Sequence, residues 1–342
     1  MPEIKILPND LINKIAAGEV VERPLSVVKE LVENSIDADA SSIEIFIIDG
    51  GKTEIKVIDN GIGIEKKQVE LSVRRHATSK LTQKNFNKIS TLGFRGEALP
   101  SIASISDFSI QSNNKNDMEG MEIRVSSGEF KYFKPVRKSK GTSVTVKNLF
   151  FSTPARLKFL KSSNYESLLI KDLIKKFALC KFNINFSLTI DGKKVLTTNF
   201  NMDKDSNEKF KTRVVEVLGE EFKINTVDFS KKNEKFNFIG LAGLPTFHFS
   251  NTKNQFVFIN GRVISDKSFN QIFKVGYRDF IPYDRFPQFI LFLECDFDEI
   301  DVNVHPSKNE VRFKNITEVR SSIISLIISR FIPLPVLILD NF

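Results

Sequence analysis

The segment from Glu30 to Gly63 contains the pattern that most restricts how this chain can fold. Glu30, Asn34 and Asp37 are spaced i, i+4 and i+7, so on a helix they share one narrow stripe. The apolar arc of that helix lies roughly opposite the stripe and is formed by Val28, Leu31, Val32 and Ser35. Pro24 is suited to the first helical position, so the sequence predicts a helix over residues 24–36. The polar stripe is open to two interpretations, a solvated helix face or part of a binding site.

A β-hairpin is predicted directly after this helix. Isoleucines alternate over residues 43–47, Asp49-Gly50-Gly51 suits a turn, and Ile55 and Val57 alternate on the return strand. Period two places Asp59 on the same face as these two residues. An inward carboxylate needs a partner, and an adenine amino group is one candidate. A surface turn capped by the aspartate is the alternative.

Two glycine motifs follow Asp59. Gly61 and Gly63 would allow the backbone to approach a ligand closely, because no Cβ intervenes. Gly93 and Gly96 precede a predicted helix, whose N-terminus favours a phosphate, although ordinary helix geometry explains such glycines equally well. If this helix begins near Gly96, Pro100 falls in or just after its first turn and costs little.

The rest of the chain predicts two domains. Strands are expected in four segments of residues 105–147 and again at 184–198, with a helix ending near Cys180. The polar run 201–209 suggests a boundary near residue 202. Beyond it we expect helices at 210–219, 266–276 and 316–331, with strands around 224–242, 255–264 and 288–296.

Charge is unevenly distributed along the 342 residues. Residues 1–202 contain 31 basic and 23 acidic side chains, whereas the remainder contains 19 of each. Residues 131–181 contain 13 basic side chains, with Glu166 and Asp172 as the acidic ones. This segment is either a surface for a phosphate backbone or a solvated lysine face.

Composition disfavours several classes of protein. Two cysteines and three scattered histidines make a disulfide framework or a His/Cys metal cluster improbable. Pro333 and Pro335 interrupt the apolar C-terminal run, and no uninterrupted apolar stretch has membrane-spanning length, so no membrane partner is expected. We expect a cytoplasmic protein, associated with the nucleoid if the source is bacterial.

Taken together, the motifs resemble a known family. The runs IAAGEVVERPLSVVKELVENSIDA, DNGIGI, RRHATSK, LGFRGEAL, GTSVTV, LFFSTPARLKFL, NGR and DVNVHPSKNEVRF occur in the order found in the N-terminal part of MutL-family mismatch-repair ATPases. The wider superfamily includes type II topoisomerase ATPase subunits, heat-shock chaperones and sensor histidine kinases. IAAGEVVERP, HATSK and FRGEAL favour MutL over these relatives.

The resemblance implies an α+β fold. Residues 1–202 would form a Bergerat-type ATPase sandwich, a mixed sheet with helices on one face, with a lid at about 65–100. Residues 203–331 would form a smaller, transducer-like α/β domain similar to a ribosomal-protein-type βαβ fold and contributing Lys308. Residues 332–342 would be an apolar tail or the start of a missing linker.

The resemblance also implies roles for individual residues, with ATP and Mg²⁺ as cofactors. Glu30 would be the general base and Lys308 a second catalytic group on the γ-phosphate, while Asn34 would hold magnesium. Asp59 would read adenine with support from Thr142. The expected ATP-binding residues are Asn34, Asp59, Gly61, Gly63, Lys80, Gly93, Arg95, Gly96 and Thr142. For Asp37 we expect only a structural or supporting role.

The implied function is a slow ATPase that acts as a switch in DNA mismatch repair. ATP would order the lid and drive homodimerisation with exchange of residues 1–20, which couples a MutS-type mismatch sensor to nuclease or helicase partners. DNA binding would be non-specific in sequence. The candidate DNA contacts are Lys267, at a position where relatives often carry arginine, and our own charge-based cluster of Arg156, Lys158, Lys161, Lys175 and Lys176.

Other interpretations remain open on the sequence. Full-length MutL proteins continue into a C-terminal dimerisation domain, often with an endonuclease site, and no such site is expected in a chain that ends at Phe342. The chain could therefore be a module that binds ATP and DNA with negligible turnover. A topoisomerase subunit would need a cleavage tyrosine and a kinase an acceptor histidine, and neither His76 nor any tyrosine has a suggestive setting.

Overall fold

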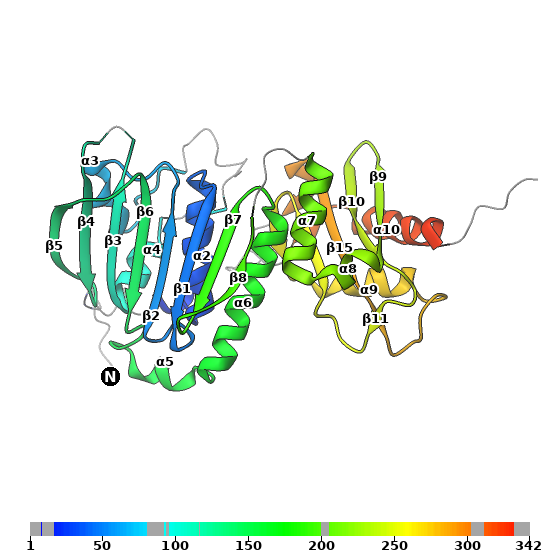
Figure 1. Ribbon diagram of the computed structural model, residues 1–342, viewed down its shortest axis with the longest axis horizontal. Helices are drawn as coiled ribbons and strands as arrows, with labels where there is room; N and C mark the ends of the chain where they lie inside the picture. Colours follow the sequence, from blue (N-terminus) through cyan, green and yellow to red (C-terminus); the bar gives the residue numbers. More distant parts are fainter. Residues whose placement is uncertain are drawn as a thin grey trace, which may run out of the picture. The chain divides into compact units, whose positions relative to one another are not determined.

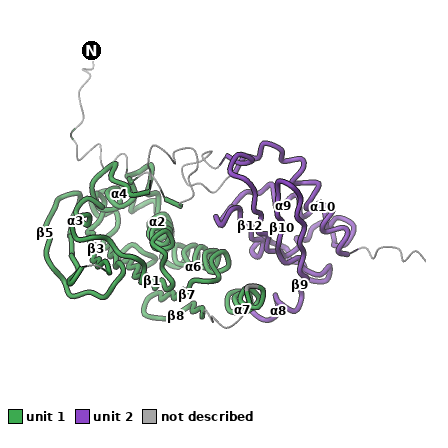
Figure 2. The backbone as a smooth tube through the Cα atoms, turned by 90° about the horizontal axis from the view of Figure 1, so that it is seen from above, with its two compact units in different colours: residues 1–217 green, residues 218–342 purple. Residues whose placement is uncertain are grey.

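The computed structural model of the protein describes residues 8, 17–80, 92–93, 96–115, 117–199, 205–301 and 311–331. The chain divides into two compact units, residues 1–217 and residues 218–342 (Figure 2). Residues 17–20 of the first unit are helical. Each unit has its own sheet, and each is described by itself below.

An eight-stranded sheet organises the first unit, in the order β5-β4-β3-β6-β2-β1-β7-β8 (Figure 1). Strand β1 pairs parallel with β7 and antiparallel with β2, so the sheet is mixed. The strands are β1 (Ser42–Ile48), β2 (Glu54–Asp59), β3 (Asp107–Asn113), β4 (Gly120–Ser126), β5 (Glu129–Val136), β6 (Gly141–Lys147), β7 (Asn185–Ile190) and β8 (Lys193–Thr197).

The predicted hairpin is confirmed as β1 and β2, joined by the short 3-10 helix η1 (Asp49–Gly51). Asp49 and both glycines of this turn have positive φ angles, a conformation that glycine adopts without steric cost. Along β2 buried and half-buried residues alternate, and Asp59 is buried with Ile55 and Val57. The period-two argument therefore placed this carboxylate on the correct face.

Helices α2, α4 and α6 lie along one side of this sheet (Figure 2). Helix α2 starts at Pro24, as predicted, and buries Val28, Leu31 and Val32. These side chains form a core with the buried isoleucines of β1 and β2. The helical elements are α2 (Pro24–Asp37), α3 (Lys66–Val69), η2 (Leu71–Val73), α4 (Ala98–Ser104), α5 (Pro154–Phe159), α6 (Ser163–Cys180) and α7 (Ser206–Leu218).

Helix α7 belongs to the first unit up to Val217, although the sequence analysis assigned it to the second domain. Its Arg213 is 1% exposed and donates to the carbonyl oxygens of Ala178 (2.8 Å) and Ile184 (2.9 Å). Burial lowers the pKa of this guanidinium, while the neighbouring Glu216 acts in the opposite direction. These buried hydrogen bonds tie α7 to the end of α6, a contact that composition does not reveal.

A five-stranded sheet of order β13-β12-β15-β10-β9 organises the second unit. Strands β12 and β15 run parallel with α9 between them in sequence, which is a βαβ arrangement. Its elements are α8 (Glu220–Ile224), β9 (Thr226–Lys232), β10 (Phe236–Gly243), β11 (His248–Phe249), β12 (Gln255–Ile259), β13 (Arg262–Ile264), α9 (Lys267–Gly276), β14 (Phe286–Pro287), β15 (Phe289–Cys295), η3 (Phe297–Glu299), β16 (Ile300–Asp301), β17 (Arg312–Phe313) and α10 (Ile316–Phe331).

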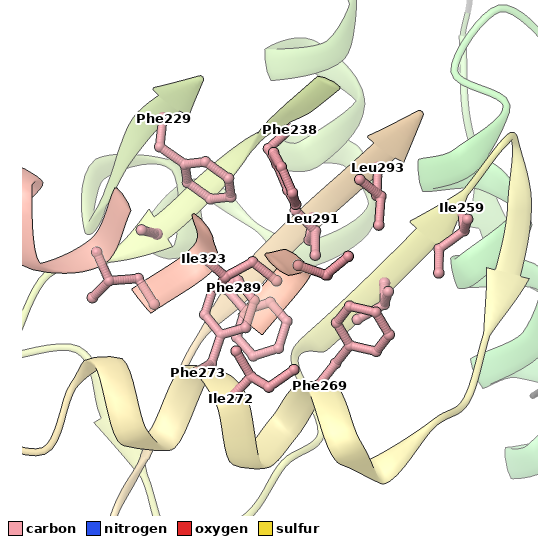
Figure 3. Close-up of a cluster of buried hydrophobic side chains, with 14 of the residues drawn as sticks. Phe229, Phe238, Ile259, Phe269, Ile272, Phe273, Phe289, Leu291, Leu293 and Ile323 are labelled. Atoms are coloured by element: carbon pink, nitrogen blue, oxygen red, sulfur yellow. The ribbon is translucent and has the colours of Figure 1, made fainter. Parts of the chain in front are cut away.

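Phenylalanine dominates the core of the second unit (Figure 3). The rings of Phe273 on α9 and Phe289 on β15 stack with centroids 3.5 Å apart. Ile323 on α10 adds to the same cluster. The two helices and the sheet thus share one apolar layer, which stabilises this unit by removing large side chains from water.

The observed architecture confirms the predicted α+β class, a large mixed sheet followed by a smaller α/β region. Within the described part of the chain, no helix is both long and apolar enough to cross a membrane. Our expectation for the tail at 332–342 lies outside the described residues.

Candidate nucleotide site

The predicted polar stripe of α2 lies on one helix face in the first unit. Glu30 and Asn34 are half-buried, and the Asp37 side chain is 7% exposed. The Asn34 Oδ1 atom accepts a hydrogen bond of 2.8 Å from the Lys80 ammonium, and Asp37 Oδ2 accepts one of 2.6 Å from the same group. For Asn34 and Asp37, the interpretation as a solvated face is therefore wrong.

Asp59 lies at the end of β2 and is 7% exposed. Its Oδ1 atom accepts hydrogen bonds from the backbone N–H groups of Gly61 (2.9 Å) and Thr142 (3.2 Å). Its Oδ2 atom accepts a hydrogen bond of 2.9 Å from the Ser35 hydroxyl on α2. Strand pairing explains the Thr142 contact, because residues 59 and 142 are directly opposite each other on β2 and β6.

The hydrogen bonds to Asp59 leave room for one more donor. An ionised carboxylate has about four lone-pair positions. Three are used by described residues, and the remaining position is on Oδ2. Burial raises the pKa of Asp59, while the three hydrogen bonds and the charge of Lys138 oppose that rise. The carboxylate can therefore accept one hydrogen bond from a ligand, such as an exocyclic amino group.

Contacts within the protein require glycine at positions 61 and 63, because a Cβ at either position would clash with a backbone oxygen. A Cβ on Gly61 would lie 2.5 Å from the Ala38 carbonyl oxygen, and one on Gly63 would lie 2.1 Å from that of Asn113. Gly63 also has a φ of 74°. The absent side chains let the segment after β2 pack against α2 and β3, which differs from the direct approach to a ligand that we expected.

Two segments of the expected lid, residues 76–77 and 96–97, lie close to each other. His76 Nδ1 is 3.7 Å from Glu97 Oε1, and a Cβ on Gly96 would lie 2.5 Å from the Ala77 carbonyl oxygen. Helix α4 begins at Ala98, so Pro100 lies in the first turn, where its missing N–H is harmless. The predicted phosphate contact Arg95 lies outside the described residues, as does Lys308.

Two residues near Asp59 were missed as site residues by the sequence reasoning. Ser35 was placed in the apolar arc of α2, and a hydroxyl in such an arc is a usable sign that an inward polar partner exists. Lys138 lies in the segment before β6 and interacts electrostatically with Asp59; burial lowers the pKa of this lysine. No periodic pattern in the sequence indicated that Lys138 would lie near the end of β2.

The cations that we grouped by charge counting occupy different settings. Lys158 and Lys161 are exposed. Arg156 is half-buried and packs on Gly18, where a Cβ would lie 1.5 Å from the guanidinium Nη2. The Nη1 atom of Arg156 is buried and donates to no acceptor within the described ranges. Arg156 therefore contacts the helical turn at residues 17–20.

The remaining candidate cations are Lys175 and Lys176 on α6 and Lys267 in the second unit. Lys176 forms an ion pair with Asp172, with 2.7 Å between Nζ and Oδ2, and burial lowers the pKa of Lys175. Helix α6 rises about 1.5 Å per residue, so roughly 18 Å separates its start from Lys175. Lys267 is exposed at the first position of α9 in the second unit.

Two family models match the chain, one inside the first unit and one that starts near the end of the first unit and continues through the described part of the second. Residues 22–149 match the model described as "Histidine kinase-, DNA gyrase B-, and HSP90-like ATPase". Residues 214–331 match the model described as "DNA mismatch repair protein, C-terminal domain". The first match contains the helix stripe and Asp59, and the second starts within α7.

The curated relatives of this chain described below are both DNA mismatch repair proteins named MutL. The DNA mismatch repair protein MutL of Rickettsia bellii is 43% identical over 324 residues, which are 95% of this chain and 53% of that protein. The DNA mismatch repair protein MutL of Azorhizobium caulinodans is 44% identical over 94% of this chain and 51% of its own length. The chain thus spans about half the length of these curated relatives.

Solved structures share the fold. The Aquifex aeolicus MutL ATPase domain complexed with ADP superimposes with a TM-score of 0.63 at 30% identity, covering 81% of this chain and 93% of that one. The crystal structure of the N-terminal domain of a DNA repair protein gives a TM-score of 0.76 at 26% identity, over 93% and 96% of the two chains.

Proposed function

We propose, because this chain belongs to the MutL family of DNA mismatch repair proteins, that it is a magnesium-dependent ATPase serving as a switch in mismatch repair. The observation that carries the proposal is the environment of Asp59. A buried carboxylate with one unused acceptor position, next to the helix that carries Glu30 and Asn34, suits an adenine amino group. The match to an ATPase domain complexed with ADP supports this choice of ligand.

The proposed reaction is the hydrolysis of ATP to ADP and phosphate. Glu30 accepts a proton from a water molecule while the oxygen of that water bonds to the γ-phosphorus. The bond between the γ-phosphorus and the β–γ bridging oxygen breaks, and ADP leaves. Glu30 and Asn34 are one helical turn apart on α2, so base and metal ligand are held in fixed register. Lys308 would offset the charge that develops on the leaving phosphates.

The side-chain oxygen of Asn34 is a suitable ligand for a hard cation such as magnesium. Its Oδ1 atom already binds a positive charge, the Lys80 ammonium at 2.8 Å, and an amide oxygen is a ligand type that magnesium accepts. Magnesium, when bound with the nucleotide, would neutralise phosphate charge and orient the γ-phosphate for in-line attack. Gly93, Arg95 and Gly96 would complete the proposed phosphate contacts.

The switch function would depend on dimerisation driven by ATP. We predict that the ATPase rate per chain rises with protein concentration and rises further when DNA is added. The reason is that a site completed only in the dimer turns over in proportion to the dimer fraction. Steady-state phosphate release between nanomolar and micromolar protein measures this, with EDTA as the metal-free control. A rate per chain that stays flat at background would instead identify a module that binds nucleotide without useful turnover.

DNA binding is proposed at the exposed pair Lys158 and Lys161. We predict that the double variant Lys158→Glu/Lys161→Glu weakens binding to a random-sequence duplex and lowers the slope of log affinity against log salt by about 2, because each phosphate contact contributes about 0.9. Arg156 is left unchanged, since it packs on the turn at residues 17–20. Fluorescence anisotropy across a salt series gives both quantities.

The matched control for this prediction is Lys193→Glu/Lys194→Glu. Both lysines are exposed on β8, at an edge of the sheet. The control makes the same change in net charge at a different place. Equal losses in the two double variants, or no loss at low salt in either, would reduce Lys158 and Lys161 to solvated side chains.

A further inference from the structure

Asp37 makes more contacts than a surface aspartate at a helix end would need. It is the last residue of α2, and its side chain is 7% exposed. Its Oδ1 atom accepts a hydrogen bond from the N–H of Leu92 (3.0 Å). Its Oδ2 atom accepts hydrogen bonds from the N–H of Gly93 (3.1 Å) and from the Lys80 ammonium (2.6 Å). Three donors from two other segments of the chain therefore converge on one carboxylate.

The position of Asp37 on its helix is electrostatically unfavourable. The C-terminal end of a helix carries a partial negative charge, so a carboxylate there is destabilising unless donors or cations compensate for it. The three donors supply that compensation. Because all three come from outside α2, the result is a fixed link between the helix of Glu30 and Asn34 and the segments at residue 80 and residues 92–93.

Lys80 is held between two groups of α2. Its ammonium lies 2.6 Å from Asp37 Oδ2 and 2.8 Å from Asn34 Oδ1, the oxygen proposed to bind magnesium. Gly93 packs over the same three groups, since a Cβ on it would lie 3.4 Å from Lys80 Nζ, 3.6 Å from Asn34 Oδ1 and 3.8 Å from Asp37 Oδ2. Of these two groups Asp37 is the stronger partner of the ammonium, because a hydrogen bond to a charged carboxylate is stronger than one to the neutral Asn34 oxygen.

We propose that Asp37 is a positioning residue of the nucleotide site, which holds the Lys80 ammonium beside Asn34 and the Leu92–Gly93 backbone against α2. This inference rests on the proposed function, because Lys80 and Gly93 act on the phosphates only if a nucleotide binds here. In this proposal Asp37 itself contacts neither the phosphates nor the metal. Asp37 would order the Lys80 ammonium and the N–H groups of Leu92 and Gly93 before the nucleotide binds. The loss of conformational entropy on ordering these groups would then not weaken the binding of the nucleotide.

The first test needs no nucleotide. In Asp37→Asn the amide keeps one acceptor oxygen but loses the charge and the second acceptor. We expect hydrogen exchange at the Leu92 and Gly93 amides to accelerate at least about tenfold, measured by mass spectrometry on peptides spanning these residues. Asp39→Asn is the matched control, because Asp39 is exposed two residues further on with a φ of 54°, which asparagine tolerates. Unchanged exchange in Asp37→Asn overturns the proposal.

The second test separates positioning from general support of the fold. Affinity for a non-hydrolysable ATP analogue with Mg²⁺ is measured by calorimetry in the wild type, Asp37→Asn, Lys80→Met and the double variant. We expect Asp37→Asn to weaken binding at least about tenfold in the wild-type background. In the Lys80→Met background the loss should be clearly smaller, because the ammonium to be positioned is then gone. A loss that is equal in both backgrounds excludes the positioning of the Lys80 ammonium by Asp37, and no loss in either background excludes any role of Asp37 in nucleotide binding.

The two tests also distinguish this inference from the proposed function. If the wild type binds no adenine nucleotide, the proposed function fails, and the inference that depends on it fails with it. If the wild type binds the analogue and Asp37→Asn binds it equally well, only the positioning role is excluded. Lys80→Met keeps the backbone contacts of Asp37, so it reports on the ammonium even if Asp37→Asn unfolds.

Discussion

Replacement of Glu30 by glutamine is expected to abolish ATP hydrolysis and to leave nucleotide affinity at the wild-type level. The amide cannot accept the proton of the attacking water, and a positioned general base contributes about 10²–10⁴-fold to a rate. The remainder of the site stays intact, because the hydrogen bonds described for Asn34 and Asp59 do not involve Glu30. Single-turnover hydrolysis and analogue binding on the same preparation separate the two effects.

The control for this variant is Glu44→Gln, an equal change at an exposed position of β1. It should hydrolyse ATP as the wild type does. Because the wild-type rate is expected to be slow, both variants must be purified identically, so that a contaminating ATPase would appear in each. Hydrolysis by Glu30→Gln at the wild-type rate would show that another group is the base.

Replacement of Asp59 by asparagine is expected to lower affinity for adenine nucleotides about 10–100-fold without unfolding the protein. The N–H groups of Gly61 and Thr142 require an oxygen at the Oδ1 position, which leaves the amide NH₂ at the Oδ2 position. There it can donate to the Ser35 hydroxyl, but it opposes the adenine amino group as donor against donor. An unpaired buried donor costs about 1–3 kcal/mol, which gives the expected range.

Two further consequences distinguish this explanation from simple damage. Burial raises the pKa of Asp59, so ionisation of the carboxylate lowers the free energy of unfolding as the pH rises through that raised value, and the neutral amide removes this loss. The thermal midpoint of Asp59→Asn should therefore not fall at neutral pH. The guanine base carries an acceptor where adenine carries its amino group, and the amide of Asp59→Asn can donate to that acceptor. The ratio of the affinities for ATP and GTP should therefore be smaller in this variant than in the wild type.

Calorimetric titration with ADP and GDP tests the statement about the base, and thermal unfolding tests the statement about stability. The control is Asp279→Asn, at a side chain 75% exposed in the second unit, and it should match the wild type in both measurements. If Asp59→Asn binds ADP as tightly as the wild type, Asp59 does not read the base. A lowered thermal midpoint would mean that the amide does not fit the hydrogen bonds as described.

Local sequence periodicity was sufficient for much of the first unit. Period two along β2 placed Asp59 on the buried face, and the spacing of Glu30 and Asn34 placed them on one face of α2. These conclusions follow from bond geometry that repeats within one element, so a single sequence contains the information. The Asp-Gly-Gly turn was predictable for the same reason, since it depends on φ angles of consecutive residues.

Groupings based on charge alone were less successful. Arg156, Lys158 and Lys175 lie close in sequence, yet one packs on the turn at residues 17–20, one is exposed and one is half-buried near the far end of α6. Net charge counts side chains without regard to what covers them. A charged segment therefore predicts an electrostatic field but not which cations a ligand can reach.

By itself, the sequence determined the longer helices and strands, the direction of the Asp59 carboxylate and the face shared by Glu30, Asn34 and Asp37. The family resemblance indicated Thr142 as a partner of Asp59. Only the tertiary structure decided the other contacts: Ser35 on Asp59, and Lys80, Leu92 and Gly93 on Asp37. The physical reason is the distance along the sequence between the interacting residues. Periodicity is set by the backbone within one element, whereas these partners are separated by 24 to 83 residues and meet only because the sheet and α2 pack together.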